Sequence, residues 1–372
     1  MLKRISTVML VCLLCTCILV SAWAAEPDTT VAERLQVSEL FTIMPRSYVS
    51  TPDGMAFHPT DGSLVVACPN FGDQSMPGTI VKVNQSGVVT PWFDVPVNVN
   101  SGVARPMGID FDTEGNLYIV DNQGWTGNLE SVDQGRILKV EFDEYGKPAK
   151  TTEIAVGMEH PNGIKIRGDY AYVTVSSLAR VQDPSGLLVS GVYCFPIDAQ
   201  GIEVTNTLAD KNILTTFITL NPNVQYGADG LVFDAAGNLY VGNFGDGAIH
   251  KIIFNTDGSV RSNEVWAKDN TQMATTDGMC IDKFGNIYVA DFSRNAVAKV
   301  SPNGTITRIA QSPDSTGLGG ELDQPGEPIV WGNKLILTCF DMVTDDGKIN
   351  SQHEMPATMA YIELDFVELG GN

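Results

Sequence analysis

Apolar and polar residues alternate in short runs along this chain, and one such pattern recurs. Its clearest copy is Thr276 to Gly304, TDGMCIDKFGNIYVADFSRNAVAKVSPNG. A polar-Gly step leads into a first apolar run, and a Gly-Asn turn separates that run from a second one. Because residues such as Ile281, Ile287 and Val289 are β-prone and Gly-Asn favours a tight turn, the pattern predicts pairs of antiparallel strands.

Five further copies follow the same pattern, and each can be aligned on one shared first position. The first-position residues are Asp53, Met107, Asn162, Asp229, Asp277 and Glu327, separated by 54, 55, 67, 48 and 50 residues. This period is typical of a four-stranded propeller blade. Six copies therefore predict an all-β fold, a six-bladed β-propeller, with almost no helix after residue 24.

Two stretches near the ends of the chain predict single strands. Leu40 to Ile43 is apolar, and residues 359–366 alternate apolar and polar positions with the period of a half-buried strand. Propellers commonly close by letting strands from both ends complete one blade. We expect these two stretches to do so.

The first 24 residues have the features of a secretory signal. Lys3 and Arg4 precede an apolar run from Val8 to Val20, and Ala22-Trp23-Ala24 fits a cleavage site. The run is short for a membrane-spanning helix, which needs about 20 residues. We therefore expect residues 1–24 to be removed, residues 25–372 to form a single propeller domain, and the protein to be periplasmic or extracellular.

The expected mature chain is strongly acidic. Without Lys3 and Arg4 it has 21 basic and 44 acidic residues, so its net charge is 21 − 44 = −23. Nucleic acids and anionic membranes are therefore poor partners, whereas a divalent cation is a better one. Much of this charge is also what a soluble secreted surface requires.

Four cysteines remain after residue 24, and their spacing does not predict a zinc site. Cys194 and Cys280 lie in apolar strand runs and are expected to be buried. Cys68 and Cys339 occupy similar places in the first and sixth copies. A disulfide between them would suit an oxidising compartment, but equivalent positions of adjacent blades usually lie too far apart for one.

The first-position residues are expected to form a ring around the central channel, because a propeller repeats about one axis. The ring would carry oxygen ligands from Asp53, Asn162, Asp229, Asp277 and Glu327, interrupted by Met107. Such a set suits Ca²⁺ or Mg²⁺, and without a cation some of the carboxyl pKa values must rise. Asp-Gly and Asn-Gly are also ordinary turn dipeptides. Their recurrence before the same strand favours the metal ring.

Two long loops and several aromatic residues are predicted near this ring. The loops are Gln123 to Gln134, which contains Trp125, and Ser177 to Ser190; tolerated surface insertions are the alternative. Phe244, Phe292, Phe340 and Trp125 would form an apolar wall above the ring. Packing between blades explains these aromatic residues equally well.

Several of these segments resemble a known family. PDGMAF, HPNGIKI, ADGLVFDAAGNLYVGNF and, above all, TDGMCIDKFGNIYVADF are similar to the regucalcin/gluconolactonase/luciferin-regenerating family, which includes diisopropylfluorophosphatase. The similarity runs from about Thr51 to Asp341. It implies a six-bladed propeller that holds a divalent cation in its central channel and hydrolyses lactones or organophosphates.

The resemblance also implies roles for individual residues. Asp53, Asn162, Asp229 and Asp277 would hold the cation, and Asp277 would also serve as base or nucleophile. Asp53 stands where the family usually has Glu, and Asp229 where it usually has Asn. His160 replaces an Arg that contacts sugar substrates, so sugar-acid specificity is not implied; His160 is either a second acid/base group or an ordinary hydrogen-bonded histidine.

Together these features predict a secreted, calcium-dependent hydrolase acting on a small lactone or ester. Trp125, Phe244, Phe292 and Glu327 would contact the substrate. The segment IYVADFSRNAVAKVSPNG also resembles an NHL repeat, so a non-catalytic binding propeller is the alternative. A strictosidine-synthase-like or lyase propeller shares the fold as well. Carboxylates converging on the axis favour the hydrolase.

Overall fold

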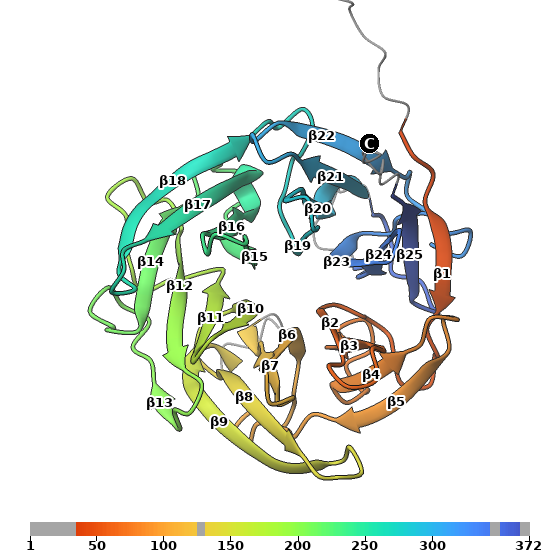
Figure 1. Cartoon of the computed structure of the whole chain (residues 1–372), viewed down its shortest axis with the longest axis horizontal. Coiled ribbons are helices and arrows are strands. Elements are labelled where there is room, and N and C mark those ends of the chain that lie inside the picture. The colour runs from red at the N-terminus through yellow and green to blue at the C-terminus, as the bar shows by residue number, and fades with distance from the viewer. Residues whose placement is uncertain (1–34, 125–130, 343–349, 365–372) are drawn as a thin grey trace, which may run out of the picture. The chain divides into compact units, whose positions relative to one another are not determined.

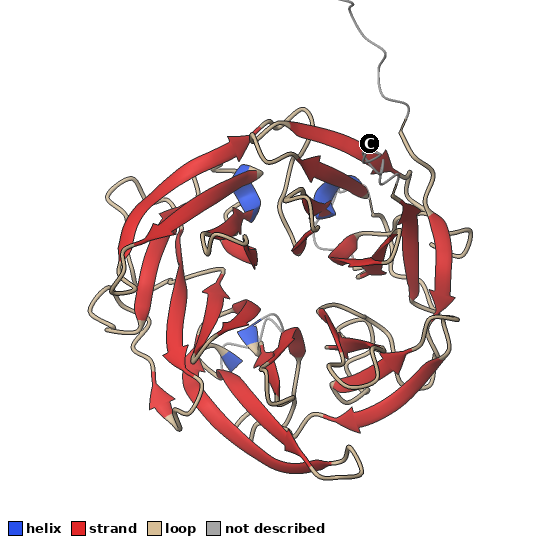
Figure 2. Ribbon diagram, viewed as in Figure 1, coloured by secondary structure: helices blue, strands red, loops and turns tan. Residues whose placement is uncertain are grey.

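The repeated strand pairs fold into six sheets arranged around a central channel (Figure 1). The computed structural model describes residues 35–124, 131–342 and 350–364, and the propeller is the unit that begins at Leu35. Within the described residues nearly all regular structure is strand, and helix is confined to short 3-10 turns such as Phe244–Asp246 and Phe292–Arg294 (Figure 2). No helix in this described part has the length and apolar character needed to cross a bilayer. The predicted fold class is confirmed.

Each blade places the first strand of its repeat nearest the channel, with the later strands further out (Figure 1). Blade 1 contains β2 (Met55–Phe57), β3 (Leu64–Cys68), β4 (Thr79–Val83) and β5 (Val89–Asp94). Blade 2 contains β6 (Pro106–Phe111), β7 (Leu117–Asp121), β8 (Gly135–Phe142) and β9 (Pro148–Met158). Blade 3 contains β10 (Pro161–Arg167), β11 (Tyr170–Val175), β12 (Val189–Pro196) and β14 (Ile213–Ile218). A short strand, β13 (Ile202–Glu203), adds to blade 2 in parallel with β9.

The second half of the ring repeats this arrangement. Blade 4 contains β15 (Ala228–Phe233), β16 (Leu239–Asn243), β17 (Ala248–Phe254) and β18 (Val260–Lys268). Blade 5 contains β19 (Met279–Ile281), β20 (Ile287–Asp291), β21 (Ala296–Val300) and β22 (Ile306–Gln311). Blade 6 contains β23 (Pro325–Trp331), β24 (Lys334–Cys339), β25 (Thr358–Glu363) and β1 (Glu39–Ile43).

The two ends of the described chain meet in blade 6. Strand β1 pairs antiparallel with β25, with Glu39 opposite Tyr361 and Ile43 opposite Thr358. The outermost strand of the last blade is thus the first strand of the chain, as the sequence predicts. The sheet formed this way joins both ends of the described chain through backbone hydrogen bonds.

Three blades share one turn between their first two strands, and its sequence explains its shape. In blade 2 the Asp112 carboxylate accepts hydrogen bonds from the backbone N–H groups of Glu114 and Asn116 and from the Tyr118 hydroxyl, which lies 3.0 Å away. Gly115 between them has φ +87°, which a residue with a side chain rarely adopts. Blades 4 and 5 repeat the turn around Asp234 and Asp282. The motif D-x-x-G-N-[LI]-Y therefore sets this hairpin.

Six buried apolar clusters hold the blades together. Each cluster joins facing residues of two neighbouring sheets: Ile80 and Ile109 lie together between blades 1 and 2, for example, and Tyr288 and Leu335 between blades 5 and 6. The same arrangement holds for three other interfaces, and the cluster between blades 2 and 3 extends further, to Phe71, Phe292 and Phe340. The core is therefore divided among the interfaces rather than gathered in one centre, as expected for a radial fold.

The four cysteines of the described chain are free thiols. Cys68 belongs to the cluster between blades 6 and 1, whereas Cys339 belongs to the cluster between blades 5 and 6. Each side chain thus faces the preceding blade, so Cys339 points away from Cys68. Cys194 and Cys280 are half-buried, which corrects the expectation that both are fully buried.

A layer of glycines brings the innermost strands close to one another. A Cβ atom on Gly54 would lie 2.3 Å from the Met107 carbonyl oxygen, and one on Gly108 would lie 2.6 Å from the Asn162 carbonyl oxygen. The series continues with Gly163 against Asp229 at 2.9 Å, Gly230 against Asp277 at 2.5 Å and Gly278 against Gly326 at 2.6 Å. Because these distances are shorter than any real Cβ contact, the blades can approach this closely only where the side chain is absent.

We predict that Gly230→Ala lowers the free energy of unfolding by about 1–3 kcal/mol, the usual cost of forcing extra atoms into a packed site. The matched control is Gly146→Ala, where no atom lies within 4 Å of the added Cβ and only the left-handed φ of +72° is strained, at about 1 kcal/mol. Chemical denaturation of both variants gives the comparison. A loss for Gly230→Ala no larger than for the control would contradict tight contact between innermost strands.

Candidate active site in the central channel

Four polar residues of the predicted ring lie at the inner ends of blades 1, 3, 4 and 5. Each precedes one of the close-packed glycines, so the tight contacts between blades fix their main chains. Asp53 is 7% exposed, Asn162 7% and Asp229 2%, and Asp277 is half-buried. The Asn162 Nδ2 atom donates a hydrogen bond to Asp229 Oδ2 at 2.9 Å, which joins blades 3 and 4.

The three carboxyl groups of this ring act on one another electrostatically. Burial raises the pKa of Asp53 to about 7. Burial also raises the pKa of Asp229 and that of Asp277 well above their ordinary values. The charge of Asp53 adds to both shifts and that of Asp229 adds to the shift at Asp277, whereas a hydrogen bond with Asp277 partly offsets the shift at Asp229. The ring therefore favours bound protons or a bound cation over three free negative charges.

The ring residues fit a hard cation by their chemistry. Their side chains offer oxygen atoms and no sulfur or imidazole, which is the ligand type that Ca²⁺ and Mg²⁺ prefer. However, the carboxylate oxygens of Asp53, Asp229 and Asp277 do not all lie within 4.8 Å of one another, as the oxygens of three ligands to one ion would. At least one of these carboxylates must turn inward for all three to contact the same ion.

Glu327 is not a first-position residue, which corrects the alignment of the sixth repeat. In blade 6 Pro325 pairs with Cys339, and in blade 3 Pro161 pairs with Val175. In both blades the register then shifts before the next paired residue, which is Pro328 in blade 6 and Ile164 in blade 3. The Glu327 N–H donates to Thr338 Oγ1 as the Gly163 N–H donates to Thr174 Oγ1. Gly326 therefore occupies the ring position and Glu327 the glycine position. The sixth repeat was misaligned because it has Pro-Gly-Glu where the other repeats have a residue with a side chain followed by Gly.

The Glu327 side chain lines the part of the channel on the other side of the glycine layer from the ring. It lines a cavity of about 380 Å³ together with Lys165, Arg167 and Cys280. The glycine layer separates this cavity from the ring and leaves a space of only about 10 Å³, roughly enough for one water. Burial of Lys165 lowers its pKa, but the nearby carboxylates of Asp110 and Glu327 outweigh this effect, so the pKa of Lys165 is raised. Burial raises the pKa of Glu327 to about 8.

Three of the four residues of the predicted aromatic wall contact one another through ring edges. Phe244 and Phe292 have ring centroids 5.8 Å apart, and Phe292 and Phe340 lie 5.7 Å apart. Phe340 contacts Phe71 at 6.2 Å, which extends the series into blade 1. The Phe340 ring also lies 3.8 Å from the Cβ position of the ring residue Gly326. The series therefore borders the ring and also packs between blades; contact of these aromatic residues with a substrate stays a prediction.

The structure describes the loop after β11, but it does not describe Trp125 of the other long loop. Leu178, from the loop after β11, is 1% exposed and belongs to the buried cluster between blades 2 and 3, so this part of the loop packs into the core. Trp125, predicted to contact the substrate, lies outside the described residues. Its role stays a prediction.

His160 lies two residues before Asn162 in an unusual backbone conformation, with φ +34°. Its ring packs against Gly124, since a Cβ there would lie 2.5 Å from the ring atoms Cε1 and Nδ1. Burial lowers its pKa, and the charged group that opposes this shift is Asp133. The pKa of His160 is thus not controlled by the ring carboxylates, and its catalytic role stays a prediction.

Tyr226 is a ring residue that the sequence reasoning missed. Burial, Asp229 and Asp277 raise its pKa far above the ordinary value, and hydrogen bonding with Ser176 and Asn162 opposes the shift. Its ring also contacts Phe244, with centroids 5.3 Å apart. Tyr226 therefore joins the polar ring to the aromatic wall. No other repeat has a tyrosine at this place, so the repeat pattern gave no signal for it.

Comparison with known proteins gives no match in sequence and many in structure. No family model matches the sequence, and no curated protein sequence matches it. Among solved structures, the matches include gluconolactonases, a luciferin-regenerating enzyme and a regucalcin. The fold is that of the gluconolactonase and regucalcin propellers.

Three of these structures show how far the likeness goes. A gluconolactonase from Xanthomonas campestris has a TM-score of 0.52 at 14% identity, over 89% of this chain and 91% of its own. A calcium-binding regucalcin from Agrobacterium tumefaciens has 0.52 at 13%, over 88% and 96%. A PQQ-bound aldose sugar dehydrogenase from Streptomyces coelicolor has 0.53 at 17%, over 89% and 98%. Since a dehydrogenase shares the architecture, the likeness shows the fold and not the reaction.

The ring predicts that calcium stabilises the protein more at pH 8 than at pH 5. The pKa of Asp53 is raised from 3.8 to about 7 in the folded chain, so without a cation stability falls as pH rises between these values, because the folded state binds the proton more tightly. Calcium favours the ionised ring and competes with the proton. Melting temperatures with calcium and with a chelator at both pH values measure the effect.

The control for this prediction is Asp53→Asn, which removes one titrating group of the ring. This variant should show a smaller difference between the calcium-induced shifts at the two pH values. Equal shifts at pH 5 and pH 8 in the unmodified protein would contradict a cation among these carboxylates.

Proposed function

We propose that this protein is a metal-dependent hydrolase of small lactones or esters, with its active site at the ring end of the channel. The observation that carries the proposal is the convergence of Asp53, Asn162, Asp229 and Asp277 beside a series of aromatic rings. A propeller that only binds partners has no need for buried carboxylates that repel one another. Known gluconolactonases and a calcium-binding regucalcin with this fold support the proposal.

The cation in this proposal is calcium, with Asp53, Asn162, Asp229 and Asp277 as its protein ligands. When bound, it supplies a Lewis acid that polarises the substrate carbonyl and stabilises the negative charge formed on its oxygen. The Asn162 amide is oriented by its hydrogen bond to Asp229. Turning the Asn162 oxygen toward the axis would exchange that hydrogen bond for a metal contact.

Asp277 is the proposed base or nucleophile. It is the least buried of the three ring carboxylates, since Asp53 and Asp229 are 7% and 2% exposed and Asp277 is only half-buried. It therefore has the best access to a substrate. As a base, Asp277 would take a proton from the attacking water. As a nucleophile, its oxygen would attack the carbonyl carbon, the ester C–O bond would break and release the alcohol oxygen, and water would then hydrolyse the resulting anhydride.

The surroundings of the ring favour a substrate with an apolar part. Phe244, Phe292 and Phe340 present ring edges and faces at the same end of the channel as Asp277. The Tyr226 hydroxyl is a neutral donor at working pH, since burial and the neighbouring carboxylates only raise its pKa further above the ordinary value. It is placed to hydrogen-bond a substrate oxygen. Secretion through residues 1–24 would place this reaction in the periplasm or outside the cell.

A hydrolysis screen tests the proposed reaction. Purified residues 25–372 are expected to hydrolyse at least one member of a panel of lactones and aryl esters, and a chelator should abolish the activity until calcium is restored. Spectrophotometric assays of ester cleavage and of proton release from lactones provide the measurement. If calcium binds but none of the panel reacts, the binding-propeller alternative gains support.

The role of Asp277 is tested by Asp277→Asn. The change keeps an oxygen for the metal and removes the basic carboxylate, so calcium-dependent stabilisation should largely persist while kcat falls by about 10²- to 10⁴-fold. By contrast, Asp53→Ala should weaken calcium binding first and activity as a consequence. Asp257→Asn, in an exposed turn, serves as the matched control. Full turnover by Asp277→Asn would overturn the assigned role.

A further inference from the structure

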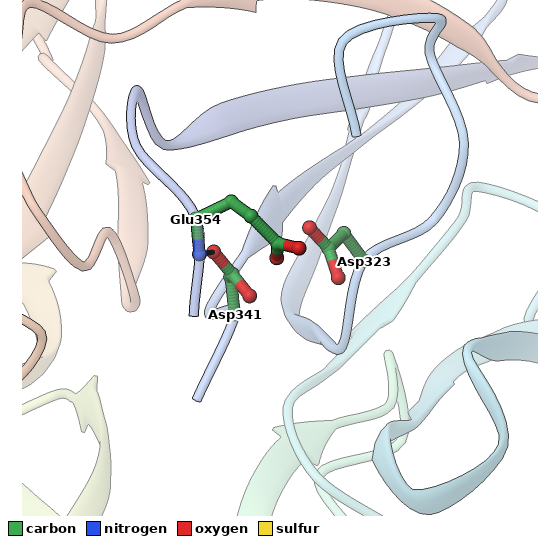
Figure 3. A group of neighbouring side chains, drawn as sticks. All are labelled: Asp323, Asp341 and Glu354. Carbon is green, nitrogen blue, oxygen red and sulfur yellow. Dashed lines mark hydrogen bonds between the residues drawn. The ribbon is translucent and has the colours of Figure 1, made fainter. Parts of the chain in front are cut away.

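A second acidic group lies in the loops of blade 6, outside the ring. Asp323 is in the segment between β22 and β23, Asp341 follows β24, and Glu354 is in the segment between β24 and β25. One ligand atom from each lies within 4.8 Å of the other two, and the three side chains point toward a common space (Figure 3). Asp323 and Asp341 are buried and Glu354 is half-buried.

Asp323 in this group and Asn350 beside it each have a buried oxygen atom with no hydrogen-bond donor among the described residues. Asp323 is 1% exposed, and its Oδ1 atom has no partner among the described residues. Asn350, also 1% exposed, donates from Nδ2 to Asp341 Oδ1 at 3.0 Å, while its own Oδ1 atom has no partner in the described chain. Unpaired buried oxygens of this kind are costly.

Two buried carboxylates outside the ring, Asp121 and Asp291, receive several hydrogen bonds each. Asp121 receives hydrogen bonds from Arg136 Nε at 2.8 Å and from the Arg105 backbone N–H at 2.7 Å. Asp291 receives the backbone N–H groups of Ala274 and Thr275, both at 2.9 Å. Because the fold normally supplies donors to such groups, the missing donors at Asp323 point to a ligand.

The charge around this group is unbalanced. Asp341, Glu354 and Asp314 all act on Asp323, and together with burial they raise its pKa to about 8. Among the strongest charge effects on Asp323, only that of His353 opposes the shift, and the His353 Nδ1 atom lies 3.2 Å from Asp341 Oδ2. A single imidazolium cannot neutralise three or four carboxylates.

We propose that Asp323, Asp341 and Glu354 form a second calcium site, with the Asn350 amide oxygen as a further ligand. All four offer oxygen atoms, which suits a hard divalent cation with 6 to 8 oxygen ligands, the remainder being water or backbone carbonyl groups. The site is separate from the ring and joins Asn350 and Glu354 to the segment that precedes β23. It does not depend on the proposed hydrolase activity.

Calcium titration calorimetry of the chelator-treated protein tests this site. The probe is calcium chloride, and the variants are the double change Asp323→Asn with Asp341→Asn, the ring change Asp229→Asn, and the exposed control Asp257→Asn. The unmodified protein is expected to bind two calcium ions per chain, the double variant one fewer, and the ring variant to retain the blade 6 site. Unchanged stoichiometry and affinity in the double variant would overturn the proposal.

Thermal melting separates a ligand site from a merely structural role. Without calcium, Asp323→Asn should melt no lower than the unmodified protein, because it removes a buried, repelled carboxylate; with calcium the order should reverse. If the double variant fails to fold, the half-buried Glu354→Gln provides the same test and should weaken this site at least tenfold. A melting temperature lowered equally with and without calcium would contradict the site.

The two calcium sites can fail separately. A single ion lost only in the blade 6 variant would support this site and count against the ring cation of the proposed hydrolase. A single ion lost only in the ring variant would do the opposite.

Discussion

The close approach of the innermost strands is the constraint on which the rest of this structure depends. Glycines at equivalent places, such as Gly108 and Gly230, let the backbone of each blade contact the next at distances that a Cβ would forbid. Apolar clusters between the sheets stabilise the same interfaces further out. Because each of these glycines follows a first-position residue, the packing that closes the channel also fixes where Asn162, Asp229 and Asp277 stand.

That packing has an electrostatic consequence. Asp53, Asp229 and Asp277 are brought to one axis with little water around them, and burial raises the pKa of each. Such crowding destabilises a fold unless protons or a cation neutralise it. The glycine layer also divides the channel, so that Glu327 and Lys165 form a separate charged group on its other side. The two halves of the channel therefore have different chemistry.

Local chemistry made much of this structure predictable. The turn around Asp282, Asn286 and Tyr288 follows from its own residues, and the repeat of such units gave the six blades and their closure by β1 and β25. The place of Glu327 was wrong by one residue, because a single repeat with Pro-Gly-Glu does not reveal its register without the partner strand. Asp323, Asp341 and Glu354 were missed because they come from loops outside the repeat and meet only in three dimensions. Tyr226 was missed for the same reason.

The central claim is that the carboxylates of the ring hold a cation, and a crystal structure grown with millimolar calcium tests it most directly. The account predicts an anomalous scattering peak on the axis, with oxygens of Asn162, Asp229 and at least one of Asp53 and Asp277 at about 2.3–2.6 Å from it. An axis without such a peak, with Asp229 and Asp277 hydrogen-bonded to each other at calcium concentrations that stabilise the protein, would contradict it.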